Sequence, residues 1–164
     1  MSVVEERTRP VLSRELIAEA ALRLTLEQPR ASLTLARLGA ELGADPTAIY
    51  RHFRNREELL LHLVDRLMVE SMEGFEPLPA WQDSLTALAE RSRRALLQRP
   101  ALAADAAWRF TGGPGERAAV TLLHTILSDA GFEPDEALEH VRAFGEMMLA
   151  HIVMTAASLS AGDA

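Results

Sequence analysis

Three arginines lie close together in the first half of the chain, where their guanidinium groups could bind phosphate. Arg51 comes first, and Arg54 and Arg56 flank Asn55 just before a long apolar-periodic stretch. Asn55 and Glu58 have the spacing of a capping box, so we expect a helix to begin at about Arg56. The free N–H groups and the positive dipole end of a helix start attract anions. The cluster therefore predicts contacts with a phosphate backbone.

The segment before these arginines has the periodicity of two short helices. Five apolar residues recur at helical spacing and should form a small core: Leu35, Leu38, Leu42, Ile49 and Phe53. Thr34 is placed to cap the first helix, and Gly43 stands where that helix must end with a positive φ. Asp45 and Pro46 then supply a cap and a first helical residue for the second helix. The stretch 34–53 is thus predicted to be a helix-turn-helix, which enters the major groove of DNA in many proteins.

Side chains on the outer side of the second helix would face DNA. With the core residues turned inward, the outward positions are Pro46, Thr47, Ala48, Tyr50, Arg51 and His52. The first three carry mainly methyl and methylene groups, which suit thymine methyl groups better than paired hydrogen bonds to base edges. Arg51 is the only long donor on this helix, and it could read a guanine or contact a phosphate. Arg7 and Arg9 could form an arm along the DNA, although chain ends are more often disordered.

The order of these features closely resembles the N-terminal DNA-binding domain of TetR-family transcriptional repressors. A first helix at Ser13–Gln28 precedes the helix-turn-helix, and Tyr50, His52 and Phe53 lead through a polar turn into the long segment RNREELLLHLVDRLM. The resemblance covers roughly residues 10–70. It implies a ligand-responsive regulator, most simply a repressor that binds a palindromic DNA operator as a homodimer. It also implies that the DNA backbone is held by Thr34, Tyr50, His52, Arg54 and Arg56.

The charge of the chain fits DNA binding once it is divided along the sequence. The net charge is −7 over 164 residues. Residues 1–70 hold 10 arginines and 11 acidic residues, whereas residues 71–164 hold 7 arginines and 13 acidic residues. Local patches govern attraction to phosphate, so the clustered arginines matter more than the total.

Composition also excludes several classes of protein. The chain has no cysteine, hence no disulfide, thiolate metal site or cysteine nucleophile. No stretch reaches the roughly 18 apolar residues of a membrane-spanning helix, and the N-terminus lacks the apolar run of a signal peptide. We therefore expect a cytoplasmic protein without a membrane partner. Serine, histidine and aspartate do not form a nucleophile-elbow or metalloprotease pattern, so neither an enzyme nor a cofactor is expected.

Proline and glycine divide the rest of the chain into further helices, expected at about 80–98, 101–110, 115–130 and 134–160. No strand-like alternation occurs, which predicts an all-α fold. We expect an N-terminal three-helix helix-turn-helix domain at residues 10–70, followed by a helical-bundle regulatory domain at residues 75–164.

The second half is more weakly similar to the regulatory domain of the tetracycline-repressor branch of the family. Trp81 opens a helix, Pro114 follows a glycine-rich loop, and Gly131-Phe132 precedes the last helix. In that branch, a histidine before the loop proline and another near the end of the fourth helix hold a drug–magnesium complex. The matching positions here are Arg109 and Met72. The resemblance therefore implies no metal site and argues against tetracycline as the ligand.

A different small-molecule effector is still expected between these helices. The candidate contacts are aromatic, sulfur-containing and imidazole side chains, namely Trp108, Phe110, His124, Phe144, Met148 and His151. Ligand pockets are usually apolar with a few polar groups. Phenylalanine and methionine at helical spacing are more often ordinary core residues, and that alternative stands for each of them.

Binding to successive major grooves requires two recognition helices about 34–36 Å apart, hence a dimer. The last predicted helix carries an apolar seam that could pair with a second copy or be buried inside the subunit: Val141, Phe144, Met148, Ile152, Thr155 and Leu159. A ligand that prefers a wider dimer would shift the population away from DNA, with the segment from Arg56 to about Met72 as the lever. Family members usually add a later dimer helix, so either a reduced interface or an incomplete chain is expected.

Two groups of the remaining polar residues have the types and spacing of possible metal ligands. Glu58, His62 and Asp65, like Glu136 and His140, could hold a divalent ion, but solvated helix faces explain these groups better. The main alternative function is a helical ligand-binding or interaction protein without sequence-specific DNA binding. An enzyme that depends on His124 or His151 has less support.

Overall fold

Eight helices make up the part of the chain that the structure, a computed structural model, describes: residues 11–161, with side chains to residue 159. The helices are α1 (Arg14–Glu27), α2 (Leu35–Leu42), α3 (Pro46–Ile49), α4 (Arg56–Met72), α5 (Trp81–Leu97), α6 (Pro100–Ala106), α7 (Pro114–Asp129) and α8 (Pro134–Ala161). No strand occurs in this span, which confirms the all-α prediction. No helix within it has the length and hydropathy needed to span a membrane. Arg7 and Arg9 lie outside the described residues.

Capping side chains fix the helix boundaries where the sequence signals predict them. Thr34, Asp45 and Asn55 each accept a hydrogen bond from a backbone N–H in the first turn of α2, α3 and α4, at 3.2, 2.8 and 2.8 Å. Gly43 ends α2 in the left-handed region with a φ of 59°. These local signals are strong because they satisfy backbone groups that the ends of a helix leave without partners.

The prediction for α6 was wrong at its C-terminal end. Residues 101–110 were expected to be helical, but α6 ends at Ala106. The indole N–H of Trp108 donates to the Asp105 carbonyl at 3.0 Å, an acceptor that a continuing helix would offer to the Arg109 N–H. The chain then leaves as an extended loop toward α7.

The first three helices close around the small core that the periodicity predicts. Leu38, Ile49 and Phe53 are buried, and Leu35 and Leu42 are half-buried against the same cluster. Burial on one face of each short helix leaves the opposite faces of α2 and α3 free for solvent or a partner.

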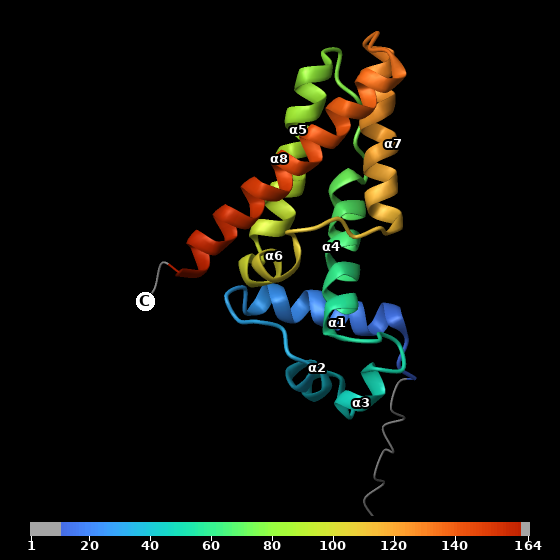
Figure 1. The fold of residues 1–164 in the computed structure, drawn as a ribbon. Helices are drawn as coiled ribbons and strands as arrows, with labels where there is room; N and C mark the ends of the chain where they lie inside the picture. Colours follow the sequence, from blue (N-terminus) through green and yellow to red (C-terminus); the bar gives the residue numbers. More distant parts are fainter. Residues whose placement is uncertain (1–10, 162–164) are drawn as a thin grey trace, which may run out of the picture.

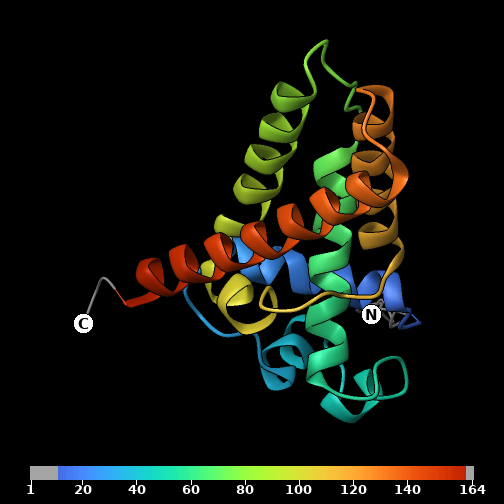
Figure 2. The same ribbon diagram turned by 45° about the horizontal axis from the view of Figure 1, so that its top comes forward.

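Helix α4 connects the lower unit, which comprises α1, α2 and α3, to the upper bundle, which comprises α5, α6, α7 and α8. Figures 1 and 2 show this connection from two directions. It rises from α1 between α5 and α7, and it packs on α5, α6 and α7. Its buried side has the 3–4 spacing of a helix packed on more than one side: Leu59, Leu60, Leu63, Val64 and Leu67. One rigid element therefore contacts both the helix-turn-helix and the upper helices.

Helix α6 makes a second connection, resting on the end of α1. The Ala101 N–H donates to the Pro29 carbonyl at 3.0 Å. The Arg99 guanidinium contacts the Leu22 carbonyl at 3.5 Å and donates to the Ala95 carbonyl at 3.1 Å. Burial lowers the pKa of Arg99 from its ordinary value. The lower and upper units are thus joined through backbone acceptors as well as through α4.

Helix α8 crosses the front of the upper bundle (Figure 1). Part of its apolar seam is buried. Val141 and Ile152 are buried in the subunit, and Phe144 and Met148 pack against the core clusters. Of the two interpretations of this seam, burial inside the subunit is correct for these residues. The opposite face is exposed, with Met147 and Met154 at 63% and 72% exposure.

Gly39 is the position at which α2 approaches the start of α3 most closely. A Cβ at Gly39 would lie 2.7 Å from the Ala44 carbonyl oxygen and 3.2 Å from Cγ of Pro46. We expect Gly39→Ala to destabilise the protein by about 1–3 kcal/mol, because overpacking outweighs the gain in helix propensity. Gly145→Ala is the matched control, since its Cβ would meet Phe110 at an ordinary 3.4 Å. Urea unfolding followed by circular dichroism measures both, and equal stability of the two variants would contradict the prediction.

Candidate DNA-binding surface and ligand cavity

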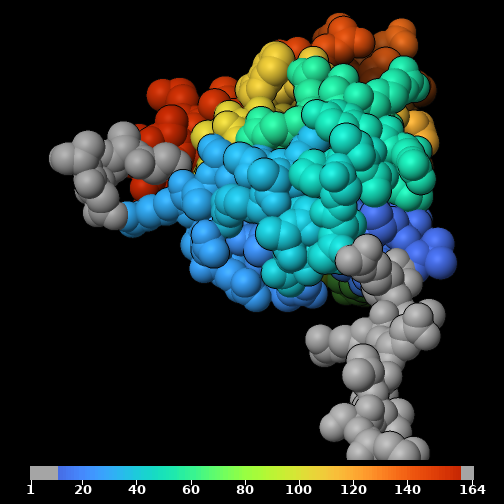
Figure 3. Space-filling model, turned by 90° about the horizontal axis from the view of Figure 1, so that it is seen from below, coloured from blue at the N-terminus to red at the C-terminus, as the bar shows by residue number. Residues whose placement is uncertain are grey.

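The outer side of α2, α3 and the following turn forms one face of the molecule, seen from below in Figure 3. Six of the predicted DNA contacts are exposed there: Thr34, Thr47, Tyr50, Arg51, Arg54 and Asn55. The other four are half-buried: Pro46, Ala48, His52 and Arg56. Exposed polar and cationic side chains on a short helix suit contact with a polyanion.

Two arginines on this face are available to an incoming partner. The Arg51 side chain has no hydrogen-bond or ion-pair partner among residues 11–159. The Arg54 side chain is 92% exposed, with its Nε 3.8 Å from the Glu58 carboxylate. The Thr47 hydroxyl, by contrast, donates to the Asp45 carboxylate at 2.6 Å. The hydroxyl proton of Thr47 is therefore already in a hydrogen bond. This fits the expectation that Thr47 contacts thymine through its methyl group.

Arg14 of α1 holds the end of the recognition helix in place. Its guanidinium lies over the Phe53 ring at 4.1 Å, donates to the His52 carbonyl, and donates to Glu58 at 3.1 Å. Glu58 also accepts the Arg54 N–H at 2.7 Å. That backbone hydrogen bond is the main cause of a lowered Glu58 pKa, with Arg14 adding to it. Sequence reasoning did not single out Arg14, because its partners lie far away along the chain.

Arg56 lies differently from the other predicted phosphate contacts. Its Nε donates to the Leu33 carbonyl at 2.7 Å, and its Nη2 donates to Asp105 of α6 at 2.5 Å. Two of the side chain's N–H donors therefore make contacts inside the subunit, between the helix-turn-helix and the upper bundle.

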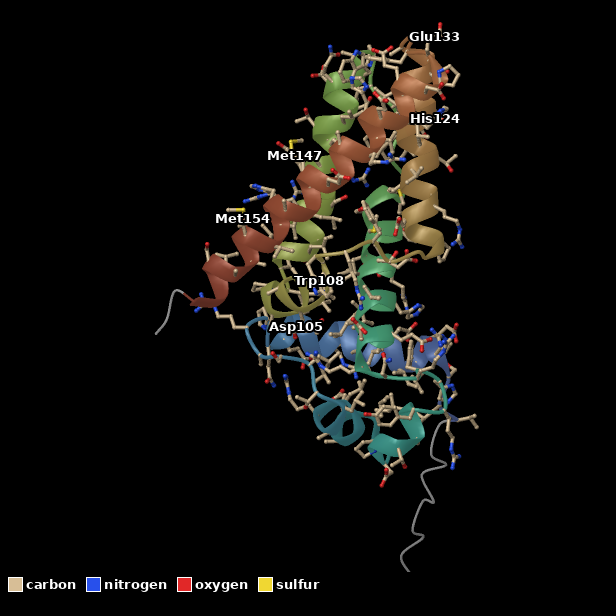
Figure 4. All side chains as sticks on the ribbon, in the orientation of Figure 1. Asp105, Trp108, His124, Glu133, Met147 and Met154 are labelled. Atoms are coloured by element: carbon tan, nitrogen blue, oxygen red, sulfur yellow. The ribbon has the colours of Figure 1, made fainter. Side chains whose placement is uncertain are left out.

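The upper bundle encloses a cavity of about 270 Å³ between α4, α5, α7, α8 and the loop after α6. Three of the predicted ligand contacts line it: Phe110, Phe144 and Met148. The other three do not: Trp108, His124 and His151. Trp108 is 55% exposed. His151 accepts from Nε of Arg93 at 3.3 Å, and His124 pairs with Ser128 at 3.4 Å. Figure 4 shows Trp108 and His124 on separate elements.

Comparison with known proteins identifies the family of this chain. The sequence model for bacterial regulatory proteins of the tetR family matches residues 17–63, from near the start of α1 into α4. A Streptomyces coelicolor A3(2) protein, provisionally described as a transcriptional regulator, is 32% identical and has a TM-score of 0.82. The match covers 90% of this chain and 74% of that chain. The chain belongs to the tetR family.

Two further proteins show how far the similarity extends. An HTH-type transcriptional regulator from Saccharopolyspora erythraea is 30% identical over 128 residues, which cover 78% of this chain but 54% of the relative. The chain thus spans about half the length of that relative. A TetR variant from Acinetobacter baumannii AYE in complex with minocycline is 26% identical, with a TM-score of 0.74 over 90% of this chain and 78% of that chain.

The two positions matched to the tetracycline-binding histidines do lie in the cavity of this TetR-family chain. Arg109 and Met72 both line it, and neither supplies an imidazole. Arg109 also forms an ion pair with Glu57 of α4 and stacks on Trp108 at 4.6 Å. One side chain therefore contacts the cavity, α4 and the loop.

Asp65 of α4 ties the start of α7 to the cavity wall. It is 4% exposed, and its carboxylate accepts from the N–H groups of Gly115 and Glu116 at 2.9 and 3.0 Å and from Thr111 Oγ1 at 2.7 Å. A Cβ on Gly113 would lie 2.3 Å from the Asp65 carboxylate. Asp65 therefore does not share a solvated face with Glu58 and His62, as the spacing had suggested. It caps a neighbouring helix.

Replacing Asp65 tests how much of the bundle depends on this carboxylate. We expect Asp65→Asn to lower the free energy of unfolding by about 2 kcal/mol, because in either orientation the amide NH2 faces a backbone N–H, that of Gly115 or that of Glu116. Asp129→Asn, at an exposed position with no such contacts, is the control and should change stability little. Thermal unfolding of the two variants side by side provides the measurement. A loss no greater in Asp65→Asn than in the control would show that the contact contributes nothing.

Proposed function

We propose that this chain is a ligand-responsive transcription regulator that binds a palindromic DNA operator as a homodimer and acts as a repressor. The single observation that carries the proposal is the exposed helix-turn-helix face with Arg51 and Arg54 available. Family membership and the HTH-type relative support it. We assign residues 10–70 to DNA binding and residues 75–164 to ligand binding and dimerisation.

The contacts with DNA divide by side-chain chemistry. Pro46, Thr47 and Ala48 offer apolar surface to the major groove, and Arg51 is the long donor. Backbone contacts come from the surrounding polar side chains, namely Thr34, Tyr50, His52, Arg54 and Asn55. We reassign Arg56 from phosphate contact to positioning, because two of its donors hold the guanidinium against Leu33 and Asp105.

The effector site is the cavity beside α4. Phe110, Phe144 and Met148 line it, and the minocycline complex of the Acinetobacter relative supports a ligand in this family. A ligand that favours one position of the loop after α6 would act on α4 through Arg109 and Glu57. Because α4 also bears the helix-turn-helix, the two recognition helices of a dimer would change spacing.

The dimer contact is the exposed side of α8. Small and methionine side chains alternate along it at three- and four-residue spacing: Ala143, Met147, Ala150, Met154 and Ala157. This is the spacing of a helix that packs on another helix, and small residues allow close approach. Figure 4 shows Met147 and Met154 pointing away from the bundle.

Selection of bound DNA from a random duplex pool tests the regulator directly. We expect a palindrome to be enriched, with Arg51→Ala weakening binding to it and Arg94→Ala, on exposed α5 surface, leaving binding unchanged. If Arg51 reads a base, the loss is about 1–3 kcal/mol and specificity relaxes at one position. If it contacts phosphate, all sequences weaken alike and the salt dependence falls by about one charge. A pool without enrichment would favour the alternative, an interaction protein that does not recognise DNA sequence.

Sedimentation equilibrium tests the dimer contact. Met147→Glu places a charge at the centre of the exposed α8 stripe, so we expect it to raise the dimer dissociation constant at least tenfold. Leu26→Glu introduces the same charge at another exposed apolar residue, on α1, and should leave association unchanged. Association that is equally strong in both variants would place the interface elsewhere.

A further inference from the structure

The three hydroxyl groups that line the cavity, those of Ser71, Ser92 and Thr111, have no unused polar hydrogen. Ser71 Oγ donates to the Met68 carbonyl at 2.8 Å, so Ser92, 3.2 Å away, must donate to Ser71. The Thr111 hydroxyl donates to Asp65. The remaining interior lining is largely aliphatic and aromatic. A ligand therefore gains from an apolar body and loses by carrying polar groups deep inside.

Three charged side chains line the cavity, and they differ in whether they have partners. Arg109 pairs with Glu57, and Glu116 accepts the Gly112 N–H at 2.7 Å. The side chain of Arg142 on α8 has no hydrogen-bond or ion-pair partner within the described part of the chain. Glu146, one turn further along α8, forms no ion pair with it. The charged side chain that has no partner at all among the three is thus a cation.

Arg142 lies at the cavity and is also open to solvent. The residue is exposed although it lines the cavity, so its charge needs no burial when the site is empty. It stands one turn from Gly145, where Cε1 of Phe110 from the opposite loop would lie 3.4 Å from an added Cβ. Arg142 and Phe110 therefore belong to the same side of the cavity, where α8 faces the loop.

We infer that the effector is an apolar organic acid, with its hydrophobic body in the cavity and its carboxylate, or a similar anionic oxygen group, on Arg142. The inference rests on the proposed effector role of the cavity. The guanidinium supplies a planar pair of donors that matches a carboxylate. A neutral ligand of the same shape would fill the cavity but leave this cation unmatched.

Matched acids and amides test the charge requirement. Naphthalene-2-carboxylate and decanoate are each compared with their primary amides by isothermal titration calorimetry on the full chain. We expect at least one acid to bind about three- to tenfold more tightly than its amide, the range of a partly solvated charge-assisted contact. If neither acid binds more tightly than its amide, the inference is wrong.

Variants locate the acid. Arg142→Gln should bring the affinity for the acid down to that of the amide and leave the amide unchanged. Arg94→Gln, on exposed α5 surface outside the cavity, should change neither. Gly145→Leu adds a side chain beside Phe110 in the cavity and should abolish binding of both probes. Acid affinity that survives either Arg142→Gln or Gly145→Leu, in variants with unchanged thermal unfolding, overturns the inference.

These titrations contain no DNA, and the operator selection contains no probe. If the chain binds acids through Arg142 but enriches no palindrome, the proposed ligand class is supported and the proposed regulatory function is contradicted. If the chain enriches a palindrome but binds acid and amide equally well, the regulatory function is supported and the proposed ligand class is contradicted.

Discussion

One buried carboxylate holds the upper bundle in register. A carboxylate in an apolar interior is costly unless several donors meet it, and Asp65 accepts from two backbone N–H groups and one hydroxyl. The donors belong to the first turn of α7 and to the loop before it, so the start of α7 is fixed relative to the middle of α4. Glycine is required where the chain passes: a Cβ on Gly113 would lie 2.3 Å from the Asp65 carboxylate, and one on Gly115 2.3 Å from the Asp65 carbonyl oxygen. The cavity has a defined shape because two of its walls cannot slide past each other here.

The contacts at the DNA-proximal end of α4 are of another kind. Arg56 and Glu57 pair with Asp105 and Arg109, and all four side chains are at least 32% exposed. Exposed ion pairs of this sort contribute little stability and exchange partners readily. Helix α4 is thus fixed firmly at its centre and loosely where it meets α6 and the following loop. A small displacement of that loop could alter the DNA-binding end without opening the core, as a two-state regulator requires.

The sequence predicted local features well and long-range pairing poorly. Helix ends could be predicted from the sequence, because capping and left-handed turns depend on neighbours a few residues away. The residues concerned are Thr34, Gly43, Asp45 and Asn55. Arg56 has the local sequence pattern of a phosphate ligand. Its guanidinium nevertheless donates a hydrogen bond to Asp105, which lies far along the chain. His124 and His151 suited a polar pocket by type, but periodicity does not say which side of α7 or α8 meets a cavity. For such residues the packing of the bundle decides the role, and no short window of sequence contains it.

Charge imposes the last constraint, because both expected partners are anions and the chain is acidic. Residues 71–164 carry 13 acidic residues against 7 arginines, so the upper unit repels DNA and favours approach by the helix-turn-helix face. The same field opposes an organic acid entering the cavity. An anionic effector can overcome it only through a local cation not already neutralised inside the protein. Arg109 is paired with Glu57, which leaves Arg142 as the cavity-lining cation, among the described residues, whose side chain has no partner. Because the chain is acidic overall, binding of an anionic effector depends all the more on Arg142.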